Sequence, residues 1–349
     1  MAGEKQLFGK FMNNYYYGKS GKGDYSRDDL PKTRWGLFWE MLRVRLAGLF
    51  RLNLLAVIAW IPMMYVLAQL VTGLFNLAGI ISAVELDRAA ATAEQLAVHE
   101  QQLPLLNNII FMALVYLVPC IMITGPFQAG LAYVTRNWAR DEHAFAWADF
   151  RDALKANWKQ ALAISAITGF VPLIIYVGYR FYGQMSANSA LFIVPQMLTL
   201  LLGLVWALAL TYIYPMMVTY KMNLLTLVRN GILLAIGRLP QTAAVRLAML
   251  VPALIVALVT WFVTPYALYA LMALAAYYAL IGNALARFAY ASLSNAVFDR
   301  FINPNIAGAQ VDRGLAKEDD LDEDELDAPQ LAGIRTGQQE KDNQEEKQG

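Results

Sequence analysis

The chain has 349 residues, of which 58% are hydrophobic and 16% are charged, and its mean hydropathy is +0.40. This composition is too apolar for an ordinary soluble domain and indicates a membrane protein. The formal net charge of +1 hides an asymmetry: residues 312–349 hold 13 acidic and 5 basic residues, a net of −8, which leaves +9 on residues 1–311. The single cysteine, Cys120, excludes an intrachain disulfide and a four-cysteine metal site.

Residues 1–32 are expected to form a basic cytoplasmic arm. They contain no continuous apolar core followed by a small-residue cleavage site, so no cleaved signal peptide is expected. Gly18, Lys19 and Ser20 match the end of a phosphate-binding loop, but Asn13 occupies the position of its first glycine and no strand precedes it. We therefore expect no bound nucleotide, and expect the arm to lie against anionic lipid or a partner.

Six apolar segments are predicted to cross the membrane. A membrane helix needs about 20 mostly apolar residues, because an ionised group at the bilayer centre costs about 2.5–3.5 kcal/mol. The sequence therefore predicts an all-α polytopic membrane domain over residues 33–302, in which prolines kink several helices. The spans are placed near residues 52–71, 109–133, 160–180, 198–220, 246–263 and 266–286, and the prolines are Pro62, Pro119, Pro172, Pro215 and Pro252.

The distribution of basic residues predicts the orientation of these spans. Ten Lys and Arg residues precede the first span, the five loops carry 1, 5, 1, 4 and 0, and seven follow the last span. Twenty-six of the 28 thus share the side of the N-terminus, and the positive-inside rule places both termini in the cytoplasm of a plasma-membrane protein. Residues 72–108 would form a long outer loop, and residues 303–349 an acidic disordered tail, because they have too few apolar side chains to offset chain entropy.

Helical periodicity on the basic side predicts amphipathic helices in the lipid headgroup region. One covers residues 33–51, a second residues 149–161, and a more apolar third Asn223 to Gly237. Asp141 and Glu142 are expected to open the second helix, where negative charge complements the positive helix end. The candidate cytoplasmic interaction face consists of Trp35, Trp39, Arg43, Arg140, Asp141, Glu142, Trp158 and Lys159.

Residues 118–162 carry a family resemblance. They read VPCIMITGPFQAGLAYVTRNWARDEHAFAWADFRDALKANWKQAL, with a proline, a Thr-Gly-Pro turn, a small-residue helix, an Arg-Asp-Glu and a Phe-rich segment ending in Asn-Trp-Lys-Gln. In this order the chain resembles the YesL-like family of bacterial membrane proteins, a domain of unknown function, and residues 212–237 extend the resemblance more weakly. The resemblance covers about half of the chain and implies an accessory or regulatory role linked to carbohydrate uptake. The family has no established catalytic residues to transfer.

The sequence predicts neither an enzyme nor a metal site. No nucleophile is accompanied by a base, and His143 and His99 lack the spacing of metal ligands. We expect no cofactor and no nucleic-acid partner. The deepest polar candidate within a span is Asn283, with Ala275 and Ala279 on its face, which favours helix packing over a solute site. Arg287, one turn further, is expected to reach the cytoplasmic headgroups.

Two functional hypotheses follow from these observations. The leading one is a non-enzymatic accessory, regulatory or scaffold protein that acts through its cytoplasmic face on subunits of another membrane transport complex. The alternative is a transporter of a neutral small solute between kinked helices. The interiors of the predicted spans carry no Asp, Glu, Lys or Arg, since Arg180 and Arg246 stand at span ends, and this disfavours ion-coupled transport, which usually needs such groups on its pathway.

Overall fold

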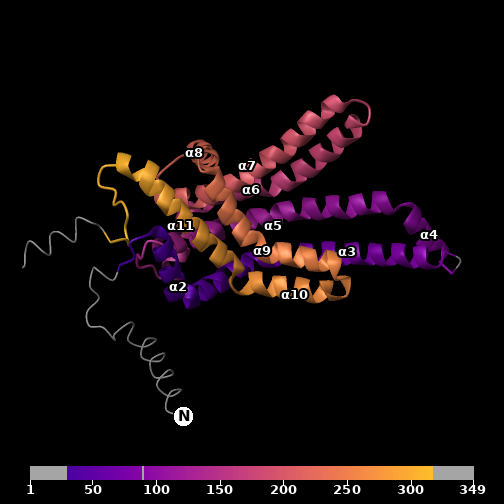
Figure 1. Ribbon diagram of the computed structural model, residues 1–349, viewed down its shortest axis with the longest axis horizontal. Helices are drawn as coiled ribbons and strands as arrows, with labels where there is room; N and C mark the ends of the chain where they lie inside the picture. The colour runs from indigo at the N-terminus through magenta and orange to yellow at the C-terminus, as the bar shows by residue number, and fades with distance from the viewer. Residues whose placement is uncertain (1–29, 89, 317–349) are drawn as a thin grey trace, which may run out of the picture. The chain divides into compact units, whose positions relative to one another are not determined.

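The computed structural model of the protein describes residues 30–88 and 90–316 (Figure 1). Residues 1–29 of the predicted basic arm 1–32 lie outside the described residues, and so do residues 317–349 of the predicted tail 303–349. Residues 303–316 of that tail are described and begin with a 3-10 turn at Asn303–Asn305. The chain divides into one unit of Met1–Glu40 with Gln310–Gly349 and a second unit of Met41–Ala309. In the first unit, Arg34 forms an ion pair with Asp312, and the Ala316 amide donates a hydrogen bond to the Pro31 carbonyl at 3.4 Å.

Every regular element of the described residues is helical. The α-helices are α2 (Arg34–Val57), α3 (Ile61–Leu86), α4 (Ala93–Glu100), α5 (Gln102–Trp138), α6 (Ala148–Ser186), α7 (Ile193–Thr219), α8 (Leu224–Gly237), α9 (Leu239–Phe262), α10 (Ala267–Tyr277) and α11 (Asn283–Phe301). Single turns of 3-10 helix are η2 (Ile58–Trp60), η3 (Ala190–Phe192), η4 (Thr264–Tyr266) and η6 (Asn303–Asn305), and η5 (Tyr278–Gly282) is a π-helical turn.

Six of the helical stretches are long and apolar enough to cross a membrane, as the sequence predicted. They are Arg34–Leu86, Gln102–Trp138, Ala148–Ser186, Ala190–Thr219, Leu239–Phe262 and Thr264–Phe301. Between 6% and 28% of their most apolar windows is buried inside the protein, so most of these side chains point outward. An outward-facing apolar surface is what lipid requires, and the chain is a multi-pass membrane protein.

Several helices continue beyond their predicted ends. The expected amphipathic helix 149–161 and the following span form one helix, α6, since no proline interrupts the chain before Pro172. The expected outer loop 72–108 is largely helical, because α3 runs on to Leu86 and α4 follows with a capping box between Thr92 and Gln95. The predicted third amphipathic stretch is present as α8, which Asn223 caps.

The predicted prolines act differently from one helix to another. Pro62 stands at the start of α3, directly after the 3-10 turn η2 that separates it from α2. Because proline lacks an amide proton and clashes with the carbonyl four residues earlier, the regular α-helix ends there. Pro119, Pro172 and Pro215 lie inside continuous helices, and so does Pro252.

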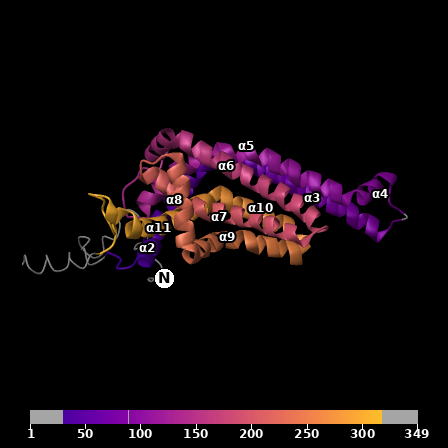
Figure 2. The same cartoon turned by 90° about the horizontal axis from the view of Figure 1, so that it is seen from above.

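Within the second unit, α5 packs against α6, and α7 lies beside α6 (Figure 2). The contact depends on glycines: a Cβ atom at Gly125 would lie 2.3 Å from the Ala161 carbonyl oxygen, and one at Gly169 would lie 2.8 Å from the Val118 carbonyl oxygen. The expected Thr-Gly-Pro turn is therefore a point of helix contact inside α5. The buried core lies where α5, α6, α7, α8 and α11 meet, around Tyr212, Met216 and Phe298.

Candidate functional site

The predicted interaction face is spread over both units. Trp35 and Trp39 are exposed on the first turns of α2 in the first unit, where both rings contact Phe38. Arg43 is exposed on the next turn of α2, which belongs to the second unit. The remaining predicted residues lie in the second unit, in the α5–α6 connection and on α6.

Arg140, Asp141 and Glu142 end α5 and do not open α6, so that prediction was wrong. The amides of Arg140 and Glu142 both donate to the Asn137 carbonyl, and Asp141 has a positive φ of 55°. This left-handed residue reverses the chain after the helix, as at many helix C-termini. Arg140 is buried and its Nε lies 3.4 Å from a Glu142 carboxylate oxygen. The acidic residue in the first turn of α6 is Asp149, which accepts a hydrogen bond from the Phe145 amide at 2.7 Å.

The beginning of α6 presents exposed aromatic and basic side chains. Phe145, Trp147 and Trp158 are 63%, 61% and 47% exposed, and the Lys159 ammonium lies 5.6 Å from the centre of the Trp158 ring. We call this set the α6 surface; it consists of Phe145, Trp147, Arg151, Lys155, Trp158 and Lys159, all exposed. It contains two of the predicted face residues, Trp158 and Lys159.

Asn53, and not Asn283, makes the polar contact across helices at the π-helical turn η5. Asn53 is fully buried; its Nδ2 donates to the carbonyls of Tyr278 at 3.0 Å and Ala279 at 2.7 Å, and its Oδ1 accepts from the Ala284 amide at 2.9 Å. A π-turn disturbs the regular i to i−4 ladder, and Asn53 supplies partners to the displaced backbone groups. Asn283 donates to the Tyr278 carbonyl of its own helical stretch at 3.2 Å.

Arg287 points into the bundle from α11. Its Nε donates to Gln128 Oε1 on α5 at 2.5 Å, and its guanidinium carbon lies 4.5 Å from the centre of the Tyr214 ring on α7. Its Nη1 is buried without a hydrogen-bond partner in the described chain. Gln128 and Tyr214 are themselves buried and Arg287 is partly exposed, so this charge is partly enclosed by neighbouring helices.

Arg246 reaches the same region from α9. Its Nε donates to Thr211 Oγ1 on α7 at 2.8 Å, and its guanidinium carbon lies 4.5 Å from the centre of the Tyr290 ring on α11. Thr211 and Tyr290 are both buried. We call the set Gln128, Thr211, Tyr214, Arg246, Arg287 and Tyr290 the arginine cluster.

Sequence reasoning missed the arginine cluster because Arg246 was taken as the edge of a predicted span and Arg287 was placed just beyond the end of another. Helix α9 begins at Leu239, ahead of Arg246, and α11 continues past Arg287 to Phe301. One signal was available: Tyr214 and Thr211 are three residues apart on α7, as Arg287 and Tyr290 are on α11, a spacing that puts both members of each pair on one helix face.

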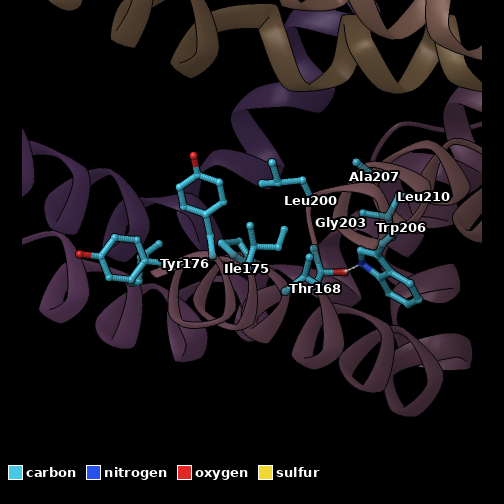
Figure 3. A pocket seen from close by; sticks show the side chains of 12 residues that line it. Thr168, Ile175, Tyr176, Leu200, Gly203, Trp206, Ala207 and Leu210 are labelled. Atoms are coloured by element: carbon cyan, nitrogen blue, oxygen red, sulfur yellow. Dashed lines mark hydrogen bonds between the residues drawn. The ribbon is translucent and has the colours of Figure 1, made fainter. Parts of the chain in front are cut away.

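An apolar groove of about 630 Å³ lies between α5, α6 and α7. Two of its polar side chains are already paired: the Trp206 indole donates to Thr168 Oγ1 at 3.1 Å (Figure 3), and the Tyr176 hydroxyl donates to Asn107 Oδ1 at 3.1 Å. A groove with so few free polar groups suits an apolar guest better than a sugar. The lining residues are Leu114, Thr168, Val171, Pro172, Ile175, Tyr176, Tyr179, Leu200, Gly203, Trp206, Ala207 and Leu210.

Across residues 30–88 and 90–316, no group of three or more His, Cys, Asp or Glu side chains is arranged to hold a metal ion.

The comparisons with known proteins give a match, which lies in the α5–α6 region. No curated protein and no solved structure matches the chain. Residues 105–179 match the model of a family described as "Protein of unknown function, DUF624", so from α5 into α6 the chain is similar to that family.

Proposed function

We propose that the protein is a non-enzymatic accessory or scaffold protein that binds another membrane protein complex through the α6 surface. The observation that carries the proposal is the length of α6 together with its exposed first turns. Its 39 residues extend about 58 Å at 1.5 Å per residue, whereas the hydrocarbon core is about 30 Å thick. A substantial part of α6 therefore extends beyond the hydrocarbon core.

The chemistry of the α6 surface supports a contact with a protein. Tryptophan and arginine are the side chains that contribute most to protein interfaces, and Trp147, Trp158 and Arg151 are exposed together here. Lys155 and Lys159 add positive charge around the aromatic rings. This combination fits a partner with an acidic rim around an apolar pocket.

We further propose that the partner is a subunit of a membrane transport complex, as the YesL-like resemblance implies for carbohydrate uptake. The protein would lie in the plasma membrane with both termini in the cytoplasm, which would place the α6 surface on the cytoplasmic side. The match over residues 105–179 includes the α5–α6 connection and the α6 surface.

The orientation can be tested with single cysteines in a Cys120→Ala background. Under the proposed topology, Ala97→Cys on α4 is labelled by a membrane-impermeant maleimide on intact cells, and Ala156→Cys on α6 is labelled after the cells are opened. Both alanines are exposed, so accessibility to the reagent depends on the side of the membrane. Labelling of Ala156→Cys on intact cells would contradict the topology.

The docking role can be tested with a photoreactive amino acid in place of Trp158. We expect a specific cross-link to a transport-complex subunit in native membranes, and a several-fold lower yield when Lys159→Glu is added, because the substitution reverses a charge next to the docking ring. The matched control carries the same photoreactive residue in place of Trp261, an exposed tryptophan near the end of α9.

Equal cross-linking of the same protein from positions 158 and 261 would contradict docking at the α6 surface.

The alternative, transport of a neutral solute, is supported by the groove between α5, α6 and α7. Solute flux into vesicles reconstituted with the protein, lost in the Asn283→Leu variant or on closing the groove with Gly203→Leu, would favour transport over the accessory role.

A further inference from the structure

We propose that the arginine cluster is a binding site for a phosphate group, carried either by a phospholipid headgroup or by a soluble phosphorylated compound. This goes beyond the accessory role, because the site lies among α5, α7, α9 and α11, on residues that the α6 surface does not contain.

The two arginines have no acidic partner. Within the described residues, neither Arg246 nor Arg287 forms an ion pair. Two like charges partly enclosed by protein repel each other, and a buried charge is costly unless it is paired. The cluster therefore lacks a counterion that an anionic ligand would supply.

The geometry brings the two guanidinium groups towards one place. Thr211 and Tyr214 share a face of α7, and Arg287 and Tyr290 share a face of α11. Arg246 contacts one residue of each pair, Thr211 and Tyr290, while Arg287 contacts Tyr214. The two cations thus approach the α7–α11 contact from α9 and from α11.

The neighbouring groups hold the arginines without neutralising them. Gln128 and Thr211 are buried and each accepts one hydrogen bond from a guanidinium Nε. The tyrosine rings lie against the guanidinium carbons, which fixes their planes through cation–π contact. Arg287 retains a buried Nη1 with no partner in the described chain. Guanidinium N–H groups that are held in position and have no hydrogen-bond partner suit a ligand with several acceptor atoms.

Phosphate fits these donors better than a halide or a single carboxylate. Its several oxygens can accept from two planar guanidinium groups at once, often in bidentate pairs, and its charge can balance both arginines. Both residues keep part of their surface exposed, so a ligand can reach them. Lipid headgroups and soluble phosphate esters share this chemistry, and the experiment below separates them.

The test uses the full-length protein, purified in a non-ionic detergent in phosphate-free buffer and stripped of lipid. Thermal unfolding is followed with added inorganic phosphate, and separately with phosphatidylglycerol in mixed micelles, against equal amounts of phosphatidylcholine. We expect at least one of the two anionic probes to raise the unfolding temperature of the wild-type protein in a saturable way. A shift with inorganic phosphate identifies a soluble ligand, and a shift with phosphatidylglycerol alone identifies a lipid headgroup.

Variants separate the site from a general salt effect. We expect Arg287→Gln and Arg246→Gln to weaken binding of the effective probe about tenfold or more, since a charged hydrogen bond is lost. The matched control is Arg300→Gln, which removes the same charge from an exposed position of α11 and should leave binding unchanged. In phosphate-free buffer, Arg287→Gln should unfold at or above the wild-type temperature, because it relieves the repulsion between the arginines.

Two results would overturn the proposal. One is a probe effect of equal size in the wild type and in both cluster variants. The other is the absence of a saturable shift of the wild-type protein with either probe; if Arg287→Gln is then less stable than the wild type, the cluster is a purely structural contact. Failure of cross-linking at position 158 would leave both results unaffected, so the two proposals fail separately.

Discussion

Replacing Gly125 by alanine is expected to destabilise the protein more than any other glycine substitution in α3 or α5. The added Cβ atom would lie 2.1 Å from Ser165 Oγ and 2.3 Å from the Ala161 carbonyl oxygen. The Ala161 carbonyl belongs to the helix backbone and cannot change rotamer as a side chain can, so α5 and α6 must move apart to make room for the Cβ atom. Overpacking costs about 1–3 kcal/mol, and alanine recovers about 1 kcal/mol of helix propensity. We expect the strain to dominate and the unfolding temperature in detergent to fall by several degrees.

The matched control for this prediction is Gly79→Ala on α3. A Cβ atom at Gly79 meets no other atom within 4 Å, so the substitution keeps the gain in helix propensity without a clash. It should leave the unfolding temperature unchanged or raise it slightly. Equal stability of the Gly125 and Gly79 variants would show that the α5–α6 contact is looser than the structure has it.

Asn53→Leu is expected to cost about 2–3 kcal/mol. Leucine is similar in size to asparagine but removes three hydrogen bonds, and it leaves the Ala284 amide and two carbonyls of η5 without this partner in an apolar setting. The π-turn should become less ordered, and α2 should lose its polar attachment to the α10–α11 region. Thermal unfolding in detergent, combined with amide hydrogen exchange across residues 278–284, measures both effects.

Asn283→Leu provides the comparison. This side chain makes one hydrogen bond of 3.2 Å within its own helical stretch, so its loss should cost less than about 1 kcal/mol. A larger loss of stability from Asn283→Leu than from Asn53→Leu would restore Asn283 as the main polar contact of this region, as the sequence suggested.

The sequence predicted the membrane helices well because their signal is local. Four of the six predicted spans fall inside one long apolar helix each, and the other two, 198–220 and 246–263, run one residue past the end of theirs. Their ends were less predictable, since a helix continues past the bilayer wherever nothing interrupts it. The region 72–108 was expected to be a loop, yet α3 extends through it to Leu86 and α4 follows.

The predicted site residues were placed correctly where a local helical pattern decided their position, and not where the backbone turn or a tertiary contact decided it. Trp158 and Lys159 were identified from one helical pattern and do lie together on α6. Asp141 and Glu142 were assigned to a helix start by charge alone, but the backbone turns at Asp141 and ends α5 there. Asn53 and Asn283 both sit near predicted span ends, and the choice between them depends on which backbone lies opposite each side chain.

By itself, the sequence determined the membrane character, the number of apolar helices, the kink before Pro62 and the absence of a phosphate-binding loop motif, because these depend on residues close together in the chain. Tertiary structure alone decided that Gly125 faces Ala161, that Asn53 meets η5, and that Arg246 and Arg287 converge on α7. These contacts join helices far apart in sequence, and hydropathy carries no information on which faces of apolar helices meet. A search for charge-free spans also excludes arginines from the interiors of the predicted helices. The folded bundle nevertheless places Arg246 and Arg287 among its helices, with no acidic partner among the described residues.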